Sequence, residues 1–280
     1  MRAPALLAAL AVVLACNAAA AAEVINLTRA DRQTLRANAY PPQGSVCRGV
    51  AIISPGAGGS ERGYRYLGEA MSALGYQAVV VGHQESGLSA LRERVRGNGL
   101  RNGLAEMVTD PAAYQARMLD IAAARQWAAE HCAGTEAILL GHSMGAATTL
   151  IEAGARNRVG VTGATSFKAY IALSPQGAGS IFPPEAWSGI RQPVFLITGT
   201  RDAGLEGGWQ TRTEPFANLP AGCKWLAVID GATHMNFAGN GGATRVEALT
   251  TELIAAFLDG VRAGRCTAPP ARAGVEIKTG

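Results

Sequence analysis

The sequence predicts an α/β fold built on a mostly parallel, twisted sheet with helices on both faces. Six short runs are rich in Val, Ile and Leu and are bounded by Gly, Pro or polar residues, as buried parallel strands are. Helix-compatible segments separate these runs. Alternating strands and helices join through right-handed crossovers, which place helices on both faces of the sheet. The expected strands are residues 50–53, 77–81, 137–140, 169–173, 194–198 and 225–229.

The N-terminal part of the domain departs from this alternation. Residues 24–40 lack an intervening helix. Antiparallel strands can follow one another without a helix between them, whereas parallel strands need a crossover. We therefore expect this part to supply antiparallel edge strands.

Two of the expected helices have recognisable ends. Asp110 can cap the free amides of a helix that starts at Pro111, whose ring is preset for the first turn. A second helix lies near the C-terminus and is expected to end at Gly260. Its apolar positions at helical spacing are Val246, Leu249, Leu253, Ile254 and Phe257.

The peptide G-H-S-M-G at 141–145 carries the strongest functional signal. It follows the expected strand 137–140 and opens a helix-compatible segment. Strand, sharp turn and helix in this order are typical of a nucleophile elbow. A side chain at Gly141 or Gly145 would collide with the strand or the helix. We expect the hydroxyl of Ser143 to be exposed above the sheet, at the start of a helix.

A serine hydroxyl needs a base to take its proton, and the base needs a group that orients it. In parallel sheets, ligands gather beyond the carboxyl ends of the strands. Asp202 and His234 each lie just after an expected strand, and Ser143, Asp202, His234 is a known chain order for such a triad. Glu206 is the substitute acid if Asp202 only caps a helix.

The other candidates for base and acid fit less well. His142 lies inside the elbow and is expected to point away from the Ser143 hydroxyl. His131 precedes a strand, at the wrong edge of the sheet, and His83 follows an early strand. Asp230 is followed by Gly231 and is better explained as a turn residue than as the acid.

With these motifs the chain resembles the α/β-hydrolase superfamily, in the branch of compact secreted serine esterases related to dienelactone hydrolases and bacterial cutinases. The likeness spans nearly the whole chain after residue 22. It includes the loop S-P-G-A-G-G at 54–59 and the histidine loop at 231–236. It implies the α/β-hydrolase fold, cleavage of carboxylic esters through an acyl enzyme, and no cofactor. By position, the backbone N–H groups of Ala57 and Met144 would form the oxyanion hole.

The chain departs from these relatives at three positions. Dienelactone hydrolases typically have a cysteine where this chain has Ser143. Polyester-degrading relatives typically have an aromatic residue in place of Ala57 and a tryptophan near Gln176. A small-molecule ester is therefore the expected substrate. A catalytically silent binding protein on this scaffold, or an acyltransferase or peptidase with the same triad, stays open as an alternative.

Three further features have two interpretations each. Phe182 and Trp187 are candidate substrate-binding residues that could wall an acyl pocket, or they could pack in the core. The segment 85–109 could attract acidic substrates, but a solvated surface loop is favoured. The glycine-rich loop 56–63 lacks the G-x-G-x-x-G and Gly-Lys-Ser/Thr patterns, which argues against nucleotide binding. The arginines of segment 85–109 are Arg92, Arg94, Arg96 and Arg101.

Four cysteines follow residue 22, and an even number in an exported protein suggests disulfides. Cys47 and Cys132 both precede strands that should be neighbours, away from the proposed site. Cys223 precedes the last expected strand, and Cys266 follows the helix packed beside it. We predict the pairs Cys47–Cys132 and Cys223–Cys266. No C-x-x-C occurs, which argues against a zinc site.

Residues 1–22 are expected to be a secretory signal, with a positive start, an apolar stretch and small residues before Glu23. The apolar stretch of about nine residues is short of the roughly 20 that a membrane span needs. Lipid attachment at Cys16 stays open. We expect one domain at 23–266, a loose tail at 267–280, and a secreted or periplasmic monomer. The net charge of +4 is too small to indicate a nucleic-acid partner.

Overall fold

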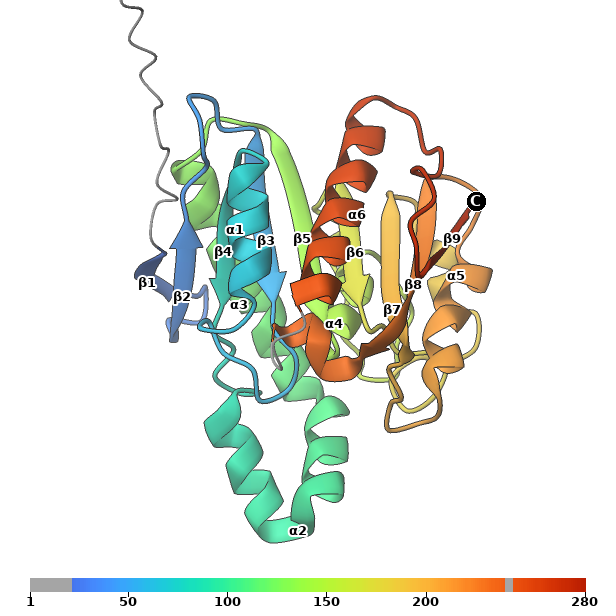
Figure 1. The fold of residues 1–280 in the computed structure, drawn as a ribbon. Helices are drawn as coiled ribbons and strands as arrows, with labels where there is room; N and C mark the ends of the chain where they lie inside the picture. Colours follow the sequence, from blue (N-terminus) through green and yellow to red (C-terminus); the bar gives the residue numbers. More distant parts are fainter. Residues whose placement is uncertain (1–21, 240–243) are drawn as a thin grey trace, which may run out of the picture.

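A computed structural model describes residues 22–239 and 244–280 of this chain (Figure 1). Nine strands form one sheet in the order β1-β2-β4-β3-β5-β6-β7-β8-β9. The strands are β1 (Glu23–Thr28), β2 (Thr34–Tyr40), β3 (Gly49–Ser54), β4 (Tyr76–Val81), β5 (Glu136–His142), β6 (Ala169–Leu173), β7 (Val194–Arg201), β8 (Lys224–Thr233) and β9 (Val275–Thr279). The prediction of an α/β fold with a mostly parallel sheet is confirmed.

Strands β3 to β8 are the six apolar runs of the sequence, and they pair in parallel. Strand β2 pairs antiparallel with both β1 and β4, so the expected antiparallel strands do lie at the edge. Every residue of β3, β4 and β6 is buried, because helices cover both faces of the sheet.

The helices form two layers around the sheet (Figure 1). The helices are α1 (Arg65–Ala73), α2 (Leu88–Val108), α3 (Pro111–Glu130), α4 (Met144–Glu152), α5 (Glu214–Asn218) and α6 (Thr244–Arg262), with 3-10 turns η1 (Ala186–Gly189), η2 (Trp209–Thr213) and η3 (His234–Ala238). Helices α1 and α6 share one apolar cluster with the sheet, and α3 and α4 share the other. Among the described residues, no helix is long and apolar enough to cross a membrane.

Two expected helix ends can be compared with the structure. Helix α3 starts at Pro111, and the Asp110 carboxylate accepts a hydrogen bond from the N–H of Ala112, as expected. The expectation that Gly260 ends the last helix is wrong. Helix α6 continues to Arg262, and Gly264 (φ 63°) takes the left-handed conformation that closes it.

The basic segment 85–109, expected to be a surface loop, is largely helical. Helix α2 spans Leu88–Val108 and is interrupted only at Gly99, where φ is 75°. The good helix formers Leu, Ala, Arg and Glu on either side of Gly99 explain the two arms. Figure 1 shows the arms as a hairpin that projects beyond the carboxyl ends of the central strands.

The tail from Thr267 was expected to be loose, and for part of it this is wrong. Residues Val275–Thr279 form strand β9, which pairs antiparallel with β8 from Ile229 back to Trp225. The apolar residues Val275 and Ile277 alternate along the strand and pack on the α6 side of the core. The expected signal segment, with Cys16, lies outside the described residues apart from Ala22.

Both expected disulfides are present. Cys47 is bonded to Cys132, and Cys223 is bonded to Cys266. Cys47 and Cys132 precede the parallel neighbours β3 and β5, and Cys223 directly precedes β8. The first bridge therefore lies at the amino ends of the parallel strands, and Cys223 of the second bridge lies at the same ends. The candidate site lies at the carboxyl ends of these strands.

Candidate active site

Ser143 stands on a sharp turn between β5 and α4. Its backbone has φ 55° and ψ −120°, an unusual conformation for a residue with a side chain. A Cβ on Gly141 would lie 2.0 Å from the carbonyl oxygen of Gly145, and one on Gly145 would lie 1.9 Å from that of Ser54. Both glycines are therefore required by close packing of the elbow against α4 and β3.

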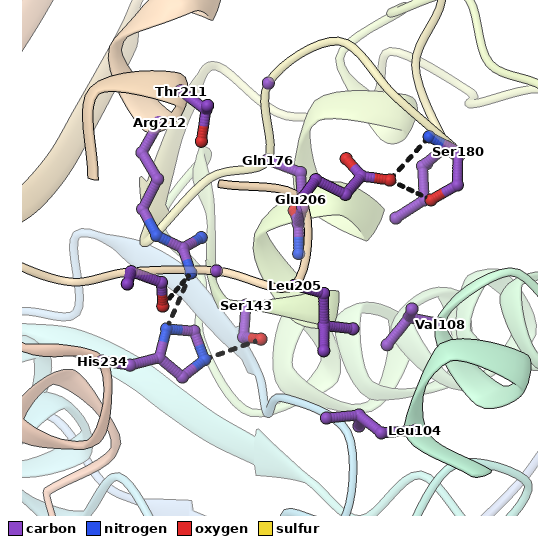
Figure 2. Close-up of a pocket in the computed structure, with 14 residues that line it drawn as sticks. Leu104, Val108, Ser143, Gln176, Ser180, Leu205, Glu206, Thr211, Arg212 and His234 are labelled. Atoms are coloured by element: carbon purple, nitrogen blue, oxygen red, sulfur yellow. Dashed lines mark hydrogen bonds between the residues drawn. The ribbon is translucent and has the colours of Figure 1, made fainter. Parts of the chain in front are cut away.

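His234 and Asp202 lie beside this serine, as their positions after β8 and β7 suggested. His234 Nε2 is 3.0 Å from Ser143 Oγ (Figure 2). On its other side, His234 Nδ1 is 2.9 Å from Asp202 Oδ1. Thr233 and the side chain of Asn236 form a capping box at the start of η3, which fixes the histidine's backbone. The three side chains come from three loops that follow the carboxyl ends of β5, β7 and β8.

Asp202 is fully buried and holds three further contacts. Its Oδ2 accepts a hydrogen bond from Thr198 Oγ1 at 2.9 Å. Arg212 Nε lies 2.9 Å from Oδ1 and also donates to the Asp202 carbonyl oxygen at 2.7 Å. A buried carboxylate needs such partners, because water cannot reach it. These contacts fix the plane of the carboxylate that faces His234.

Arg212 is a site residue that the sequence analysis did not find. Besides Asp202, it donates to the carbonyl oxygens of Ser174 at 2.8 Å and Pro175 at 3.2 Å, and its Nη2 is 3.1 Å from His234 Nδ1. Burial lowers the pKa of Arg212, while the Asp202 carboxylate opposes that shift. Arg212 thus joins the loops after β6 and β7 to the histidine.

Glu206, the substitute acid, is not next to His234. Its carboxylate accepts hydrogen bonds from the backbone and hydroxyl of Ser180, across the cavity (Figure 2). His131 is stacked on Trp127. His83 is buried, with Nε2 2.9 Å from Ser54 Oγ and Nδ1 2.8 Å from a carboxylate oxygen of Asp120.

His142 does not contact the Ser143 hydroxyl and instead connects two loops. Its Nε2 is 3.1 Å from the carbonyl oxygen of His234, and its Nδ1 is 2.8 Å from Tyr64 Oη, which accepts from the N–H of Gly56. Burial lowers the pKa of His142 well below its usual value, so the ring is neutral. A neutral ring can donate from Nε2 to the carbonyl and accept at Nδ1 from the phenol. Burial raises the pKa of Tyr64 to about 12, so the phenol keeps its proton.

The loop 54–59 lies directly against the nucleophile. A Cβ on Gly56 would be 3.2 Å from Ser143 Cβ. Within the described ranges, neither the N–H of Ala57 nor that of Met144 makes a hydrogen bond, whereas the N–H groups of Gly56 and Gly58 are both paired. Met144 is the first residue of α4, where N–H groups have no acceptor inside the helix.

A cavity of about 310 Å³ opens beside Ser143 and His234. Its apolar wall comes from Leu104, Val108, Ile181 and Leu205, and its polar side includes Gln176, Ser180 and Glu206 (Figure 2). The first two apolar residues lie on the second arm of α2. That hairpin thus forms part of the cavity wall.

The proposal that Phe182 and Trp187 wall the pocket is wrong. Both side chains are fully buried, neither lines the cavity, and their rings pack on each other with centroids 5.4 Å apart. They belong to the core beneath the loop after β6, because their large apolar surface is better removed from water. Over residues 22–239 and 244–280, no group of three His, Cys, Asp or Glu side chains could hold a metal ion.

Comparisons with known proteins agree with this fold. No family model matches the chain. The chain is 26% identical over 203 residues to Cutinase 2 of Thermobifida cellulosilytica and, over the same length, 26% identical to Cutinase cut1 of Thermobifida fusca. The matches cover 72% of this chain but 65% and 53% of the two cutinases, so the chain spans between half and two thirds of their length.

A solved structure shares the architecture over most of both chains. It is an alpha-beta serine hydrolase homologue from Coxiella burnetii, with a TM-score of 0.54 and 16% sequence identity, covering 82% of this chain and 96% of that one. At this identity the likeness concerns the fold. The chain thus has the α/β-hydrolase fold and resembles the serine esterases of that superfamily, with cutinases among its relatives.

Proposed function

We propose that this protein is a serine hydrolase that cleaves carboxylic esters through an acyl enzyme. The observation that carries the proposal is the continuous contact from Asp202 through His234 to Ser143 Oγ, at 2.9 and 3.0 Å, beside an open cavity. The sequence likeness to cutinases supports the ester as the bond attacked. No cofactor takes part in this reaction.

In the first half-reaction Ser143 Oγ attacks the acyl carbon, and its proton passes to His234 Nε2. Asp202 stabilises the resulting imidazolium through Nδ1. The former carbonyl oxygen becomes an oxyanion, which the N–H groups of Ala57 and Met144 stabilise. The tetrahedral species collapses, the bond to the alcohol oxygen breaks, and His234 returns the proton to the leaving alcohol.

In the second half-reaction water attacks the acyl carbon of the ester on Ser143. His234 takes one proton from the water and then gives it to Ser143 Oγ as that bond breaks. The free acid leaves and the enzyme is restored. The apolar wall of the cavity and its volume of about 310 Å³ suit the carbon chain of a small ester.

The serine is tested by the substitution Ser143→Ala. We expect it to abolish turnover of p-nitrophenyl esters, because among the described residues Ser143 carries the hydroxyl that contacts His234 Nε2. The circular dichroism spectrum and the melting temperature should stay close to wild type. The matched control is Ser188→Ala, at an exposed serine in η1 outside the cavity. Turnover retained by Ser143→Ala would refute the assignment.

The alternatives predict different products. A silent binding protein on this scaffold would not react with a fluorophosphonate probe, whereas an activated Ser143 would be labelled covalently. An acyltransferase would give a new ester when an alcohol competes with water, and a peptidase would cleave peptide bonds. The two disulfides support an oxidising compartment, which fits an exported enzyme. Residues 23–266, with strand β9 added to their sheet, would form its catalytic domain.

A further inference from the structure

Arg117 is a fully buried arginine on helix α3, behind the loop 54–59. A buried charge is costly unless it is paired and hydrogen bonded. Arg117 Nε donates to Thr148 Oγ1 at 3.0 Å and Nη1 donates to Ser86 Oγ at 2.5 Å. Its Nη2 donates to the carbonyl oxygen of Pro55 and lies 3.4 Å from Ser54 Oγ. One guanidinium therefore contacts three separate segments of the chain.

Two of these contacts hold the chain on either side of Ala57. The Pro55 carbonyl is followed directly by Gly56 and Ala57 in the chain. On the other side of Ala57, the N–H of Gly58 donates to the carbonyl oxygen of Ser86 at 2.8 Å, and the Ser86 side chain is the one held by Arg117. Arg117 therefore fixes both ends of the short stretch in which the Ala57 N–H lies.

The third contact reaches the helix that carries Met144. Thr148 Oγ1 accepts from Arg117 and donates to the carbonyl oxygen of Met144 at 2.8 Å, one turn earlier in α4. The planar guanidinium has fixed donor directions, so it sets the relative position of the groups it binds. Through Arg117, the first turn of α4 and the Ala57 loop are connected by direct hydrogen bonds.

Arg117 keeps its charge although it is buried. Burial lowers the pKa of Arg117 to about 10, so the group remains charged at neutral pH. Asp120, three residues later on α3, is buried as well and binds His83 and Arg29. Arg29 is the second buried cation of this network, but its hydrogen bonds go to carboxylates and not to the Ala57 loop.

We propose that Arg117 is a positioning residue that holds the N–H groups of Ala57 and Met144 on one point, where the oxyanion of the reaction develops. The inference rests on the proposed function, because it assigns Arg117 a role in the same reaction. Arg117 does not touch the substrate. It holds the N–H groups of Ala57 and Met144 in position before the reaction. The two donors then need not reorganise when the oxyanion forms in the transition state.

The test compares Arg117→Met with Arg29→Met, which removes a buried cation from the same network without touching the oxyanion segments. Both variants are expected to melt at lower temperature than wild type. At a temperature where both are folded, Arg117→Met should lose about 10²-fold in kcat with KM nearly unchanged, the scale of losing one oxyanion donor. Arg29→Met should stay within about twofold of wild-type kcat.

Binding of a trifluoromethyl ketone tests the position of the two donors directly. A general loss of stability in the folded enzyme would not weaken this binding. Ser143 Oγ adds to the ketone carbon and leaves an oxyanion in the hole. The affinity of Arg117→Met for this compound should fall by the same factor as kcat/KM. The pH profile of kcat/KM should keep its shape, because Asp202 and His234 are not in contact with Arg117.

Arg117→Lys keeps the buried charge but loses the planar set of donors, and it serves if Arg117→Met does not fold. Its kcat should lie between wild type and one hundredth of wild type. Wild-type kcat in Arg117→Lys, or equal losses in Arg117→Met and Arg29→Met, would overturn the proposal. The proposed function is judged separately, by wild-type esterase activity and its loss in Ser143→Ala.

Discussion

Arg212 places a buried positive charge against both Asp202 and His234. Its Nη2 approaches His234 Nδ1 at 3.1 Å, the same atom that Asp202 Oδ1 approaches at 2.9 Å. When Nδ1 carries the proton, it donates to Asp202, and Nε2 is then free to accept the Ser143 proton. The short distance from Arg212 Nε to Asp202 Oδ1 holds this carboxylate in place to select that tautomer.

His83 makes folding stability depend on pH. Burial lowers the pKa of His83 to about 4, with the positive charge of Arg117 adding to the effect and Asp120 opposing it. An unfolded histidine titrates near 6.5. Between these two values the unfolded chain binds a proton that the native chain does not, so stability is lost as pH falls.

We therefore expect the free energy of unfolding to decrease as pH is lowered from about 6.5 to about 4, more steeply in wild type than in His83→Gln. The Gln side chain keeps a hydrogen-bonding group toward Ser54 Oγ and Asp120 but does not titrate. Urea unfolding at several pH values measures both slopes. Parallel slopes in the two proteins would show that His83 is not the group responsible.

The α2 hairpin supplies the wall that faces Leu205 across the cavity. Leu104 and Val108 come from its second arm (Figure 2). Leu100, next to Gly99 between the two arms, is 68% exposed. The hairpin is joined to α3 by the ion pair of Arg94 with Asp110, the residue that caps α3. The position of the wall is thus tied to the central fold.

Leu104→Ala should enlarge the cavity and shift the preference toward longer acyl chains. We expect the ratio of kcat/KM for p-nitrophenyl octanoate over acetate to rise about 10-fold, the effect of a few carbon atoms in an apolar pocket. Leu100→Ala, on the same hairpin but exposed, is the matched control. If both substitutions change the ratio equally, Leu104 does not limit chain length.

The strands and the elbow could be predicted from the sequence because their signals are local. Buried parallel strands are continuous apolar runs, and the two glycines around Ser143 are demanded by the turn itself. The helical arms of α2 and strand β9 were missed. Glycines at 97, 99 and 103 obscure the helical pattern of α2, and β9 forms only because the edge of β8 is available to pair with it.

The buried arginines could not be found in the same way, because their partners are distant in the chain. Arg117 is 62 residues from Pro55, and Arg212 is 38 residues from Ser174. A partial signal does exist in α3. Arg117 and Asp120 stand at helical spacing with the buried Tyr114 and Ile121, and charges on an apolar helix face indicate a buried network.

The two disulfides close long loops of the chain. The cysteines are 85 residues apart in Cys47–Cys132 and 43 apart in Cys223–Cys266. In the chain-entropy description, each bridge removes freedom from the unfolded chain worth roughly 4 kcal/mol. Cys47 and Cys132 lie at the amino ends of β3 and β5, the edge of the sheet opposite Ser143.

We expect the double variant Cys47→Ala/Cys132→Ala to lose a few kcal/mol of unfolding free energy while its kcat at 25 °C stays near wild type. Urea unfolding and ester hydrolysis of the same preparation measure the two effects. A loss of kcat that matches the loss of stability would mean that the bridge also shapes the catalytic loops.

The separation of the bridges from Ser143 has a practical consequence for making the protein. A host compartment that keeps thiols reduced would yield chains that hydrolyse esters when freshly purified in the cold. The same chains would inactivate early on warming or storage, and mild oxidation would restore their shelf life without altering their specific activity.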